Sequence, residues 1–100
     1  MMAGNDTIIL KLYVAGTAPN SARARANLEV ILQGLPDGRC QVEIIDVFQE
    51  PLRALDDGVI VTPTLVKVSP PPSEQIVGDL GNTGRVRDVL GIAEGGHGRA

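Results

Sequence analysis

The chain has 100 residues and a formal net charge of −3, which suits a single domain with one hydrophobic core. Its lysines and arginines are scattered, which argues against nucleic acid or an anionic membrane as the main partner. The single cysteine, Cys40, cannot form an internal disulfide, and no stretch approaches the roughly 20 apolar residues that cross a bilayer. The first six residues, "MMAGND", do not have the pattern of a secretory signal, so we expect a cytoplasmic location.

The first half of the chain predicts a strand, a helix and a second strand. Residues 7–14, "TIILKLYV", are almost continuously apolar and β-branched, which is typical of a central strand covered on both faces. The next segment carries apolar residues at helical spacing, and we expect Asn20 or Ser21 to cap the start of this helix. Residues 40–48, "CQVEIIDVF", then predict the second strand.

The second half contains shorter elements separated by prolines. Pro51 suits the first position of a short helix over residues 51–57. Pro63 removes a hydrogen-bond donor from "VIVTPTLVKV", so we expect a break at Thr62–Pro63 and a strand over residues 64–68. The remaining segments predict a stiff, extended connection over 70–72, a strand over 74–80, and a helix over 83–90 capped by Asn82 or Thr83.

The expected order of elements is β-α-β-α-β-β-α, which is the thioredoxin-like arrangement of an α/β fold. Residues 7–91 form this domain in our interpretation. Residues 1–6 are expected to be a flexible N-terminus, and residues 92–100 a flexible tail rich in glycine.

The position that holds two redox cysteines in many thioredoxin-like proteins lacks them here. It reads Ala18-Pro19-Asn20-Ser21, and the only histidine, His97, lies in the tail, so thiol–disulfide exchange is excluded. Thr62-Pro63-Thr64 matches the cis-proline site of such folds, which makes Pro63 a structural cis-proline candidate. We therefore predict no enzymatic activity, no catalytic residue, no cofactor and no metal.

Two lysines interrupt otherwise aliphatic strands. Burying Lys11 or Lys67 costs desolvation energy unless the amine reaches water or an acid. Both residues therefore either face an edge or extend to solvent, or they form a basic groove with Arg23 that receives an acidic partner. The sequence leaves these alternatives open. The carboxylates of Asp46, Glu50, Asp56 and Asp57 lack metal-ligand spacing and predict a solvated rim.

At this point the chain resembles the KaiB family of clock proteins. The resemblance covers about residues 7 to 80 and rests on "ILKLYVAGTAPNS", "VEIIDV", "TPTLVKV", "PPP" and "IVGDL", in the family's order. It implies a non-enzymatic protein that binds a KaiC-type ATPase. It also implies a homo-oligomer, dimer or tetramer, in a ground state with the order β-α-β-β-α-α-β, which switches to a thioredoxin-like binding state.

The resemblance also carries over to single residues. Lys11, Arg23 and Lys67 match basic positions that the family uses on its surfaces, so they are the candidate partner-binding residues. The chain departs from the family at Glu43, often a lysine, and at residues 73–75, where basic residues are usual. The C-terminal segment of the chain also differs from that of the family. These departures suggest a divergent family member of non-cyanobacterial type.

A second hypothesis is a redox-inactive thioredoxin-like or glutathione-binding protein, in which Ser21 and the Pro63 backbone would hold a thiol. No basic residue is clearly placed for the carboxylates of glutathione. A third is a structural protein that associates only with itself.

Overall fold

The computed structural model describes residues 7–92, and the order β-α-β-α-β-β-α predicted from the sequence is confirmed. The flexible ends predicted for residues 1–6 and 92–100 lie outside the described residues, apart from Ile92. The elements are β1 (Ile8–Val14), α1 (Pro19–Leu32), β2 (Cys40–Asp46), α2 (Pro51–Asp56), β3 (Thr64–Ser69), β4 (Glu74–Val77) and α3 (Thr83–Leu90).

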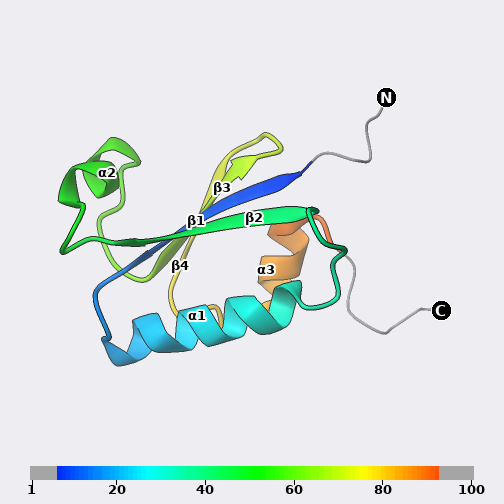
Figure 1. Ribbon diagram of the computed structural model, residues 1–100, viewed down its shortest axis with the longest axis horizontal. Coiled ribbons are helices and arrows are strands. Elements are labelled where there is room, and N and C mark those ends of the chain that lie inside the picture. The colour runs from blue at the N-terminus through cyan, green and yellow to red at the C-terminus, as the bar shows by residue number, and fades with distance from the viewer. Residues whose placement is uncertain (1–6, 93–100) are drawn as a thin grey trace.

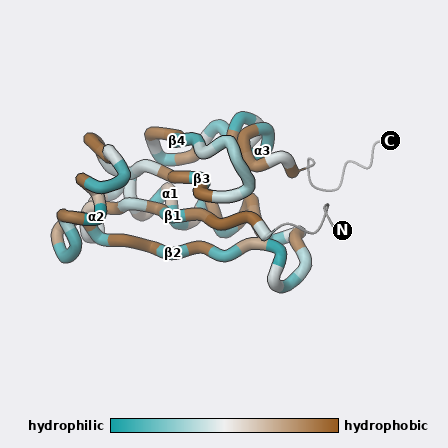
Figure 2. The backbone as a smooth tube through the Cα atoms, turned by 90° about the horizontal axis from the view of Figure 1, so that it is seen from above, coloured by the Kyte–Doolittle hydropathy of each residue, from teal (hydrophilic) through white to brown (hydrophobic). Residues whose placement is uncertain are grey.

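The four strands form one mixed sheet in the order β2-β1-β3-β4, which Figure 2 shows from above. β1 runs parallel to β2 and antiparallel to β3, and β4 pairs antiparallel with β3. Helices α1 and α3 pack on one face of the sheet, whereas α2 lies at one end and covers part of the opposite face (Figure 1). This is a thioredoxin-like α/β fold.

β1 supplies buried side chains to both faces, as expected for a central strand. Its even-numbered residues, with Leu12 fully buried, join the larger core beneath α1 and α3. Tyr13 points the other way and is fully buried with Ile45, Ala54 and Val66 beneath α2. The uninterrupted apolar composition of this strand therefore reflects two separate cores.

The predicted caps of α1 are wrong. The helix begins earlier, at Pro19, and its N-cap residue Ala18 makes no side-chain hydrogen bond to the helix. Proline at the first position has no N–H that needs a partner, and its φ is already helical. Ser21 consequently lies inside the first turn, where its Oγ accepts a hydrogen bond of 3.0 Å from the backbone N–H of Ala15. Asn20 accepts a bond from the side chain of Arg23 instead.

The connection between β3 and β4 also differs from expectation. Residues 70–72 do not form an extended spacer, because the chain turns back within residues 70–73 and places Lys67 opposite Glu74. The Ser69–Pro70 and Pro71–Pro72 peptide bonds are cis. β4 ends at Val77 because the chain leaves the extended conformation at Gly78 (φ 117°). At α3, by contrast, the predicted cap is confirmed, since Asn82 Oδ1 accepts from the Arg85 N–H.

Replacing Leu12 with alanine tests how far the fold depends on the core beneath α1 and α3. Because Leu12 is fully buried, we expect Leu12→Ala to lower the free energy of unfolding by about 2–5 kcal/mol. Leu52→Ala is the control, since Leu52 is 71% exposed and its loss should change stability by less than about 0.5 kcal/mol. Urea titration of both variants measures the difference, and equal losses would contradict this description of the core.

Candidate functional site

The place of a thioredoxin redox site is occupied here by groups already engaged within the fold. The Thr62–Pro63 peptide bond is cis, and the Pro63 carbonyl accepts a hydrogen bond of 2.9 Å from Gly78 N–H. Ser21, the one hydroxyl in the redox position, is 1% exposed and accepts from the backbone. Thr64 is buried as well, and its Oγ1 donates to the Val61 carbonyl. These groups stabilise the loops at this end of the molecule and offer no exposed nucleophile.

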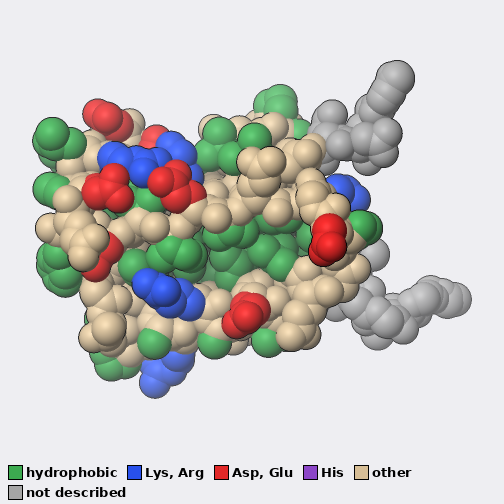
Figure 3. Space-filling view, in the orientation of Figure 1, with side chains coloured by type: hydrophobic (Ala, Val, Ile, Leu, Met, Phe, Trp, Pro, Cys, Tyr) green, Lys and Arg blue, Asp and Glu red, His purple; other side chains and the backbone are tan. Residues whose placement is uncertain are grey.

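The same end of the molecule carries a group of exposed apolar side chains, which we call the apolar end surface. They come from the turn after β2, from α2, and from the loop that leads to Pro63. Figure 3 shows hydrophobic side chains at this end, on the left of the view. Its members are Phe48 (74% exposed), Leu52 (71%), Leu55 (71%), Ile60 (92%) and Val61 (48%). Because exposed apolar groups of this kind often take part in interactions between proteins, the apolar end surface is a candidate binding surface.

Three side chains attach α2 to the centre of the sheet, and we call them the Asp57 cluster. Asp57 Oδ2 accepts a hydrogen bond of 2.5 Å from the Tyr13 hydroxyl and one of 3.1 Å from Lys11 Nζ. The bond from Tyr13, followed by the bond from Lys11, holds the pKa of the Asp57 carboxyl below its ordinary value. Burial raises the pKa of Tyr13, and Asp57 raises it further, so the phenol remains protonated and donates. These bonds attach α2, which carries part of the apolar end surface, to β1.

A second set of charges lies beside this cluster. Arg53 donates from its two terminal nitrogens to the two carboxylate oxygens of Glu43, at 2.5 and 2.8 Å, and also contacts Glu50. These bonds lower the pKa of Glu43 and raise that of Arg53. The paired geometry links α2 to β2.

The predicted solvated acidic rim is wrong for two of its four residues. Asp57 is engaged as described above. Asp46 Oδ1 accepts from the backbone N–H groups of Gly16 and Phe48, at 3.3 and 2.9 Å. Within residues 7–92, no group of acidic, histidine and cysteine side chains could hold a metal ion. Cys40 is partly buried against the core, and this burial raises the pKa of its thiol.

The fold does not bring Lys11, Lys67 and Arg23 together. In the β1–β3 register Lys11 lies opposite Val66 and Leu10 opposite Lys67, so the two lysines point to opposite faces of the sheet. β1 and β3 are central strands, so neither lysine faces an edge. Lys67 is 6% exposed, Lys11 meets the Asp57 carboxylate, and Arg23 is exposed on the first turns of α1.

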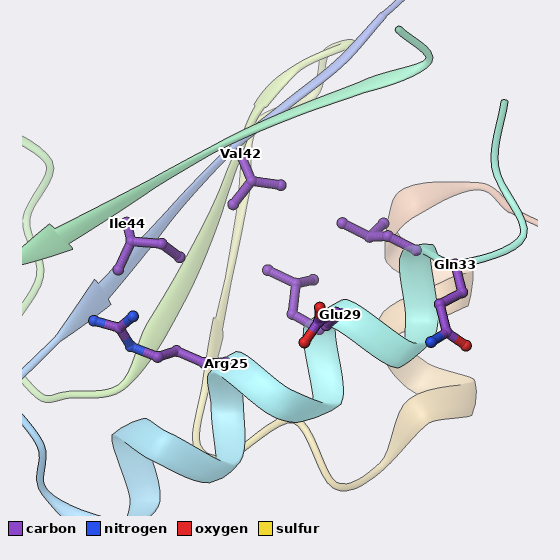
Figure 4. A pocket seen from close by; sticks show the side chains of 7 residues that line it. Arg25, Glu29, Gln33, Val42 and Ile44 are labelled. Carbon is purple, nitrogen blue, oxygen red and sulfur yellow. The ribbon is translucent and has the colours of Figure 1, made fainter. Parts of the chain in front are cut away.

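A groove separates α1 from β2, and we call it the α1–β2 groove. Its volume is about 490 Å³, and Figure 3 shows hydrophobic side chains inside it. In Figure 4, Val42 and Ile44 extend from β2 toward α1, which contributes Arg25, Glu29 and Gln33. Val42 and Ile44 are each 39% exposed, because α1 lies over β1 and leaves the face of β2 uncovered.

Sequence reasoning missed the end surface, the Asp57 cluster and the groove. A usable signal existed for the first, since Leu52 and Leu55 are large apolar residues on a six-residue helix that buries only Ala54. For the other two, the decisive information is the pairing of segments far apart in the chain. Tyr13 and Asp57 are 44 residues apart.

Comparison with known proteins identifies the family of this chain. A family profile described as the KaiB domain matches residues 11–92. The chain belongs to the KaiB family. Among its relatives, a circadian clock oscillator protein KaiB from Acaryochloris marina is 48% identical over 86 residues, covering 86% of this chain and 83% of the relative. One from Nostoc punctiforme is 44% identical over 86 residues, covering 86% of this chain and 83% of the relative.

Solved structures place this KaiB-family chain among thioredoxin-like folds. The N-terminal domain of Synechococcus elongatus SasA superposes with a TM-score of 0.72 at 25% identity, covering 95% of this chain and 93% of that domain. Chloroplastic thioredoxin z gives the same TM-score at 23% identity and covers 89% of this chain and 80% of its own, which shows the fold alone. Over residues 7–92, no helix is both long and apolar enough to cross a membrane.

Asp57→Asn tests the Asp57 cluster. At pH 7 we expect the free energy of unfolding to fall by about 1–3 kcal/mol, because hydrogen bonds to a partly buried charge are lost. The folded-state pKa of Asp57 is lowered, so its contribution is complete above the ordinary value of 3.8 and disappears as the pH falls through the lower folded-state value. The difference in the free energy of unfolding between the wild type and Asp57→Asn should therefore become smaller in that acidic range. Urea titrations at a series of pH values measure this difference, and Asp56→Asn, at an exposed position, is the control. A difference that does not change with pH would contradict the stabilising role given to the Asp57 carboxylate.

Proposed function

We propose that this chain is a non-enzymatic clock or timing protein that binds a KaiC-type ATPase through its apolar end surface. Membership of a family whose curated members are named circadian clock oscillator proteins supports the timing role. The exposure of Leu52, Leu55 and Ile60 on one end of the molecule carries the choice of surface.

The groups at the apolar end surface suit binding of a partner protein rather than catalysis. The Pro63 carbonyl, the Ser21 hydroxyl and the Thr64 hydroxyl each form a hydrogen bond within the fold. Apolar side chains are therefore the main feature that this end of the molecule offers to a partner. Large apolar residues at the centre of an interface supply most of its binding energy, and they need no activated group. We therefore propose that shape and apolar burial determine the choice of partner.

The basic residues have unequal roles in this proposal. Arg23 is exposed in the first turns of α1, at the same end of the molecule as α2 in Figure 1, so it is placed to contact an acidic group of the ATPase. Lys11 acts indirectly, since its amine holds Asp57 and hence α2. Lys67 is buried and contributes only if the chain rearranges.

We also propose that the second half of the chain switches between this fold and the family's oligomeric ground state. The unequal packing of the two halves supports this. β1 is buried on both faces, whereas α2 has six residues with one buried side chain and β4 has four residues. Elements with few buried apolar contacts separate from a core at low cost.

Leu55→Lys and Ile60→Lys test the binding surface. Both residues are exposed, so the variants should fold normally while the affinity for the KaiC-type ATPase of the same organism falls at least about tenfold. Val30→Lys is the matched control, because Val30 is 55% exposed on α1 and lies outside the apolar end surface. Size-exclusion chromatography and titration with ATP present measure binding. Failure of the wild-type chain to bind under any nucleotide condition, or equal loss with Val30→Lys, would refute the proposal.

NMR secondary chemical shifts test the switch. In the fold described here, residues 51–56 and 83–90 are helical and residues 74–77 are extended. We expect a second, slowly exchanging set of resonances confined to residues 51–90, with the first half unchanged. A single set under all conditions of temperature and concentration would exclude a populated switch.

A further inference from the structure

Helix α2 is held on the sheet largely by polar contacts, and these contacts reach three strands. Its one buried side chain, Ala54, is small, and apolar contact has no preferred direction, so packing alone does not fix the rotation of this six-residue helix about its axis. The Asp57 cluster attaches its C-terminal end to β1. Gln75 of β4 donates a bond of 2.7 Å to the Asp57 carbonyl. Toward the other edge of the sheet, the side chain of Arg53 reaches β2.

Arg53 is fixed through both its side chain and its main chain. The two terminal nitrogens of its planar guanidinium each donate to a different oxygen of Glu43, so the group is held at two points. Its Nη1 also lies 3.5 Å from Oε1 of Glu50, the N-cap residue of α2. The carbonyl oxygen of Arg53 lies 3.1 Å from the Tyr13 hydroxyl oxygen. One residue of α2 is therefore anchored on two neighbouring strands, β1 and β2.

The exposed leucines of α2 lie on either side of this anchored residue. Leu52 directly precedes Arg53, Leu55 follows two residues later, and both are 71% exposed. Because successive residues of a helix are rotated by about 100°, turning α2 away from its Arg53 contacts would move both leucines. They would then change position relative to Phe48, which belongs to the turn after β2 and not to the helix. The shape of the apolar end surface thus depends on the orientation that Arg53 gives to α2.

We propose that Arg53 is a positioning residue for partner binding, because its two-point pair with Glu43 holds Leu52 and Leu55 in the orientation that the partner meets. This inference rests on the proposed function, since it concerns the same apolar end surface. Arg53 itself is directed to β2 and acts through the two leucines. A surface held in its binding orientation loses less conformational freedom when the complex forms.

The pair should affect affinity more than stability. The side chains of Arg53 and Glu43 are 34% and 52% exposed, and exposed ion pairs contribute little to the stability of a fold. If α2 instead samples several orientations, the affinity falls in proportion to the fraction of molecules in the binding orientation. A residue that only stabilises the fold would lower stability and leave the affinity of the folded molecules unchanged. The two quantities therefore separate positioning from a purely structural role.

Arg53→Lys and Glu43→Gln test the positioning role. A lysine keeps the charge but cannot form the two-point pair, and a glutamine keeps the size of Glu43 without its charge. Each variant should bind the KaiC-type ATPase of the same organism at least about threefold more weakly with ATP present, while its urea unfolding midpoint stays close to that of the wild type. Arg85→Lys is the matched control, because Arg85 is exposed on α3, which packs on the opposite face of the sheet.

A charge exchange separates positioning from direct contact between Arg53 and the partner. Arg53→Glu and Glu43→Arg should each lower the affinity, because like charges then face each other between α2 and β2. The double variant restores an opposite pair and should bind more tightly than either single variant. If Arg53 contacted the partner itself, the double variant would present the wrong charge there. A double variant that binds no better than Arg53→Glu would therefore overturn the proposal.

The methyl NMR signals of Leu52 and Leu55 report the orientation of α2 without any partner. We expect Arg53→Lys to shift these signals and Arg85→Lys to leave them unchanged. Unchanged signals in Arg53→Lys would overturn the positioning role, as would wild-type affinity of this variant in a titration where Leu55→Lys fails to bind. In that case the apolar end surface would remain the binding site. A wild type that does not bind the ATPase would instead refute the proposed function, and the positioning role with it.

Discussion

Burial of β1 on both of its faces is the constraint on which the other features of this fold depend. Leu12 packs beneath α1 and α3, while its neighbour Tyr13 packs beneath α2, and both side chains are fully buried. A strand that supplies two cores must be central, with pairs on both sides and helices on both faces. β2 and β3 occupy the sides, which leaves β2 at one edge and β4 at the other.

The two faces are covered to different extents, and this difference produces both surfaces of interest. The face beneath α1 and α3 holds the larger core. On the other face α2 contributes one buried residue, Ala54, and polar bonds through Asp57 and Arg53 supply the remaining attachment. Because α2 buries only Ala54 in the core, Leu52 and Leu55 remain exposed. Because α1 lies over β1, the edge strand β2 keeps an open apolar row.

The two lysines of the central strands lie in different environments. Lys11 interrupts an aliphatic strand, yet its amine meets the Asp57 carboxylate at 3.1 Å, with both side chains about one-quarter exposed. This ion pair fixes the position of α2 on the sheet, because hydrogen bonds are directional and apolar contacts are not. Lys67 belongs to the opposite face and is buried there. A single basic groove from both residues is therefore incompatible with the alternation of side chains along paired strands.

The sequence by itself determined the order of the elements, the central place of residues 7–14, the break before Thr64 and the absence of a redox cysteine pair. These depend on local periodicity, proline and composition, which are read within a few residues. Only the tertiary structure decided which faces Lys11 and Lys67 occupy, that Asp57 meets Tyr13, and that Val42 and Ile44 remain uncovered. Those features depend on strand register and on where a helix settles across the sheet, and neither is encoded in a short segment. The start of α1 lies between these cases, because Pro19 and Ser21 are both plausible local signals. Ala15, which follows the end of β1, donates its N–H to the Ser21 hydroxyl, so Ser21 lies inside the helix and Pro19 begins it.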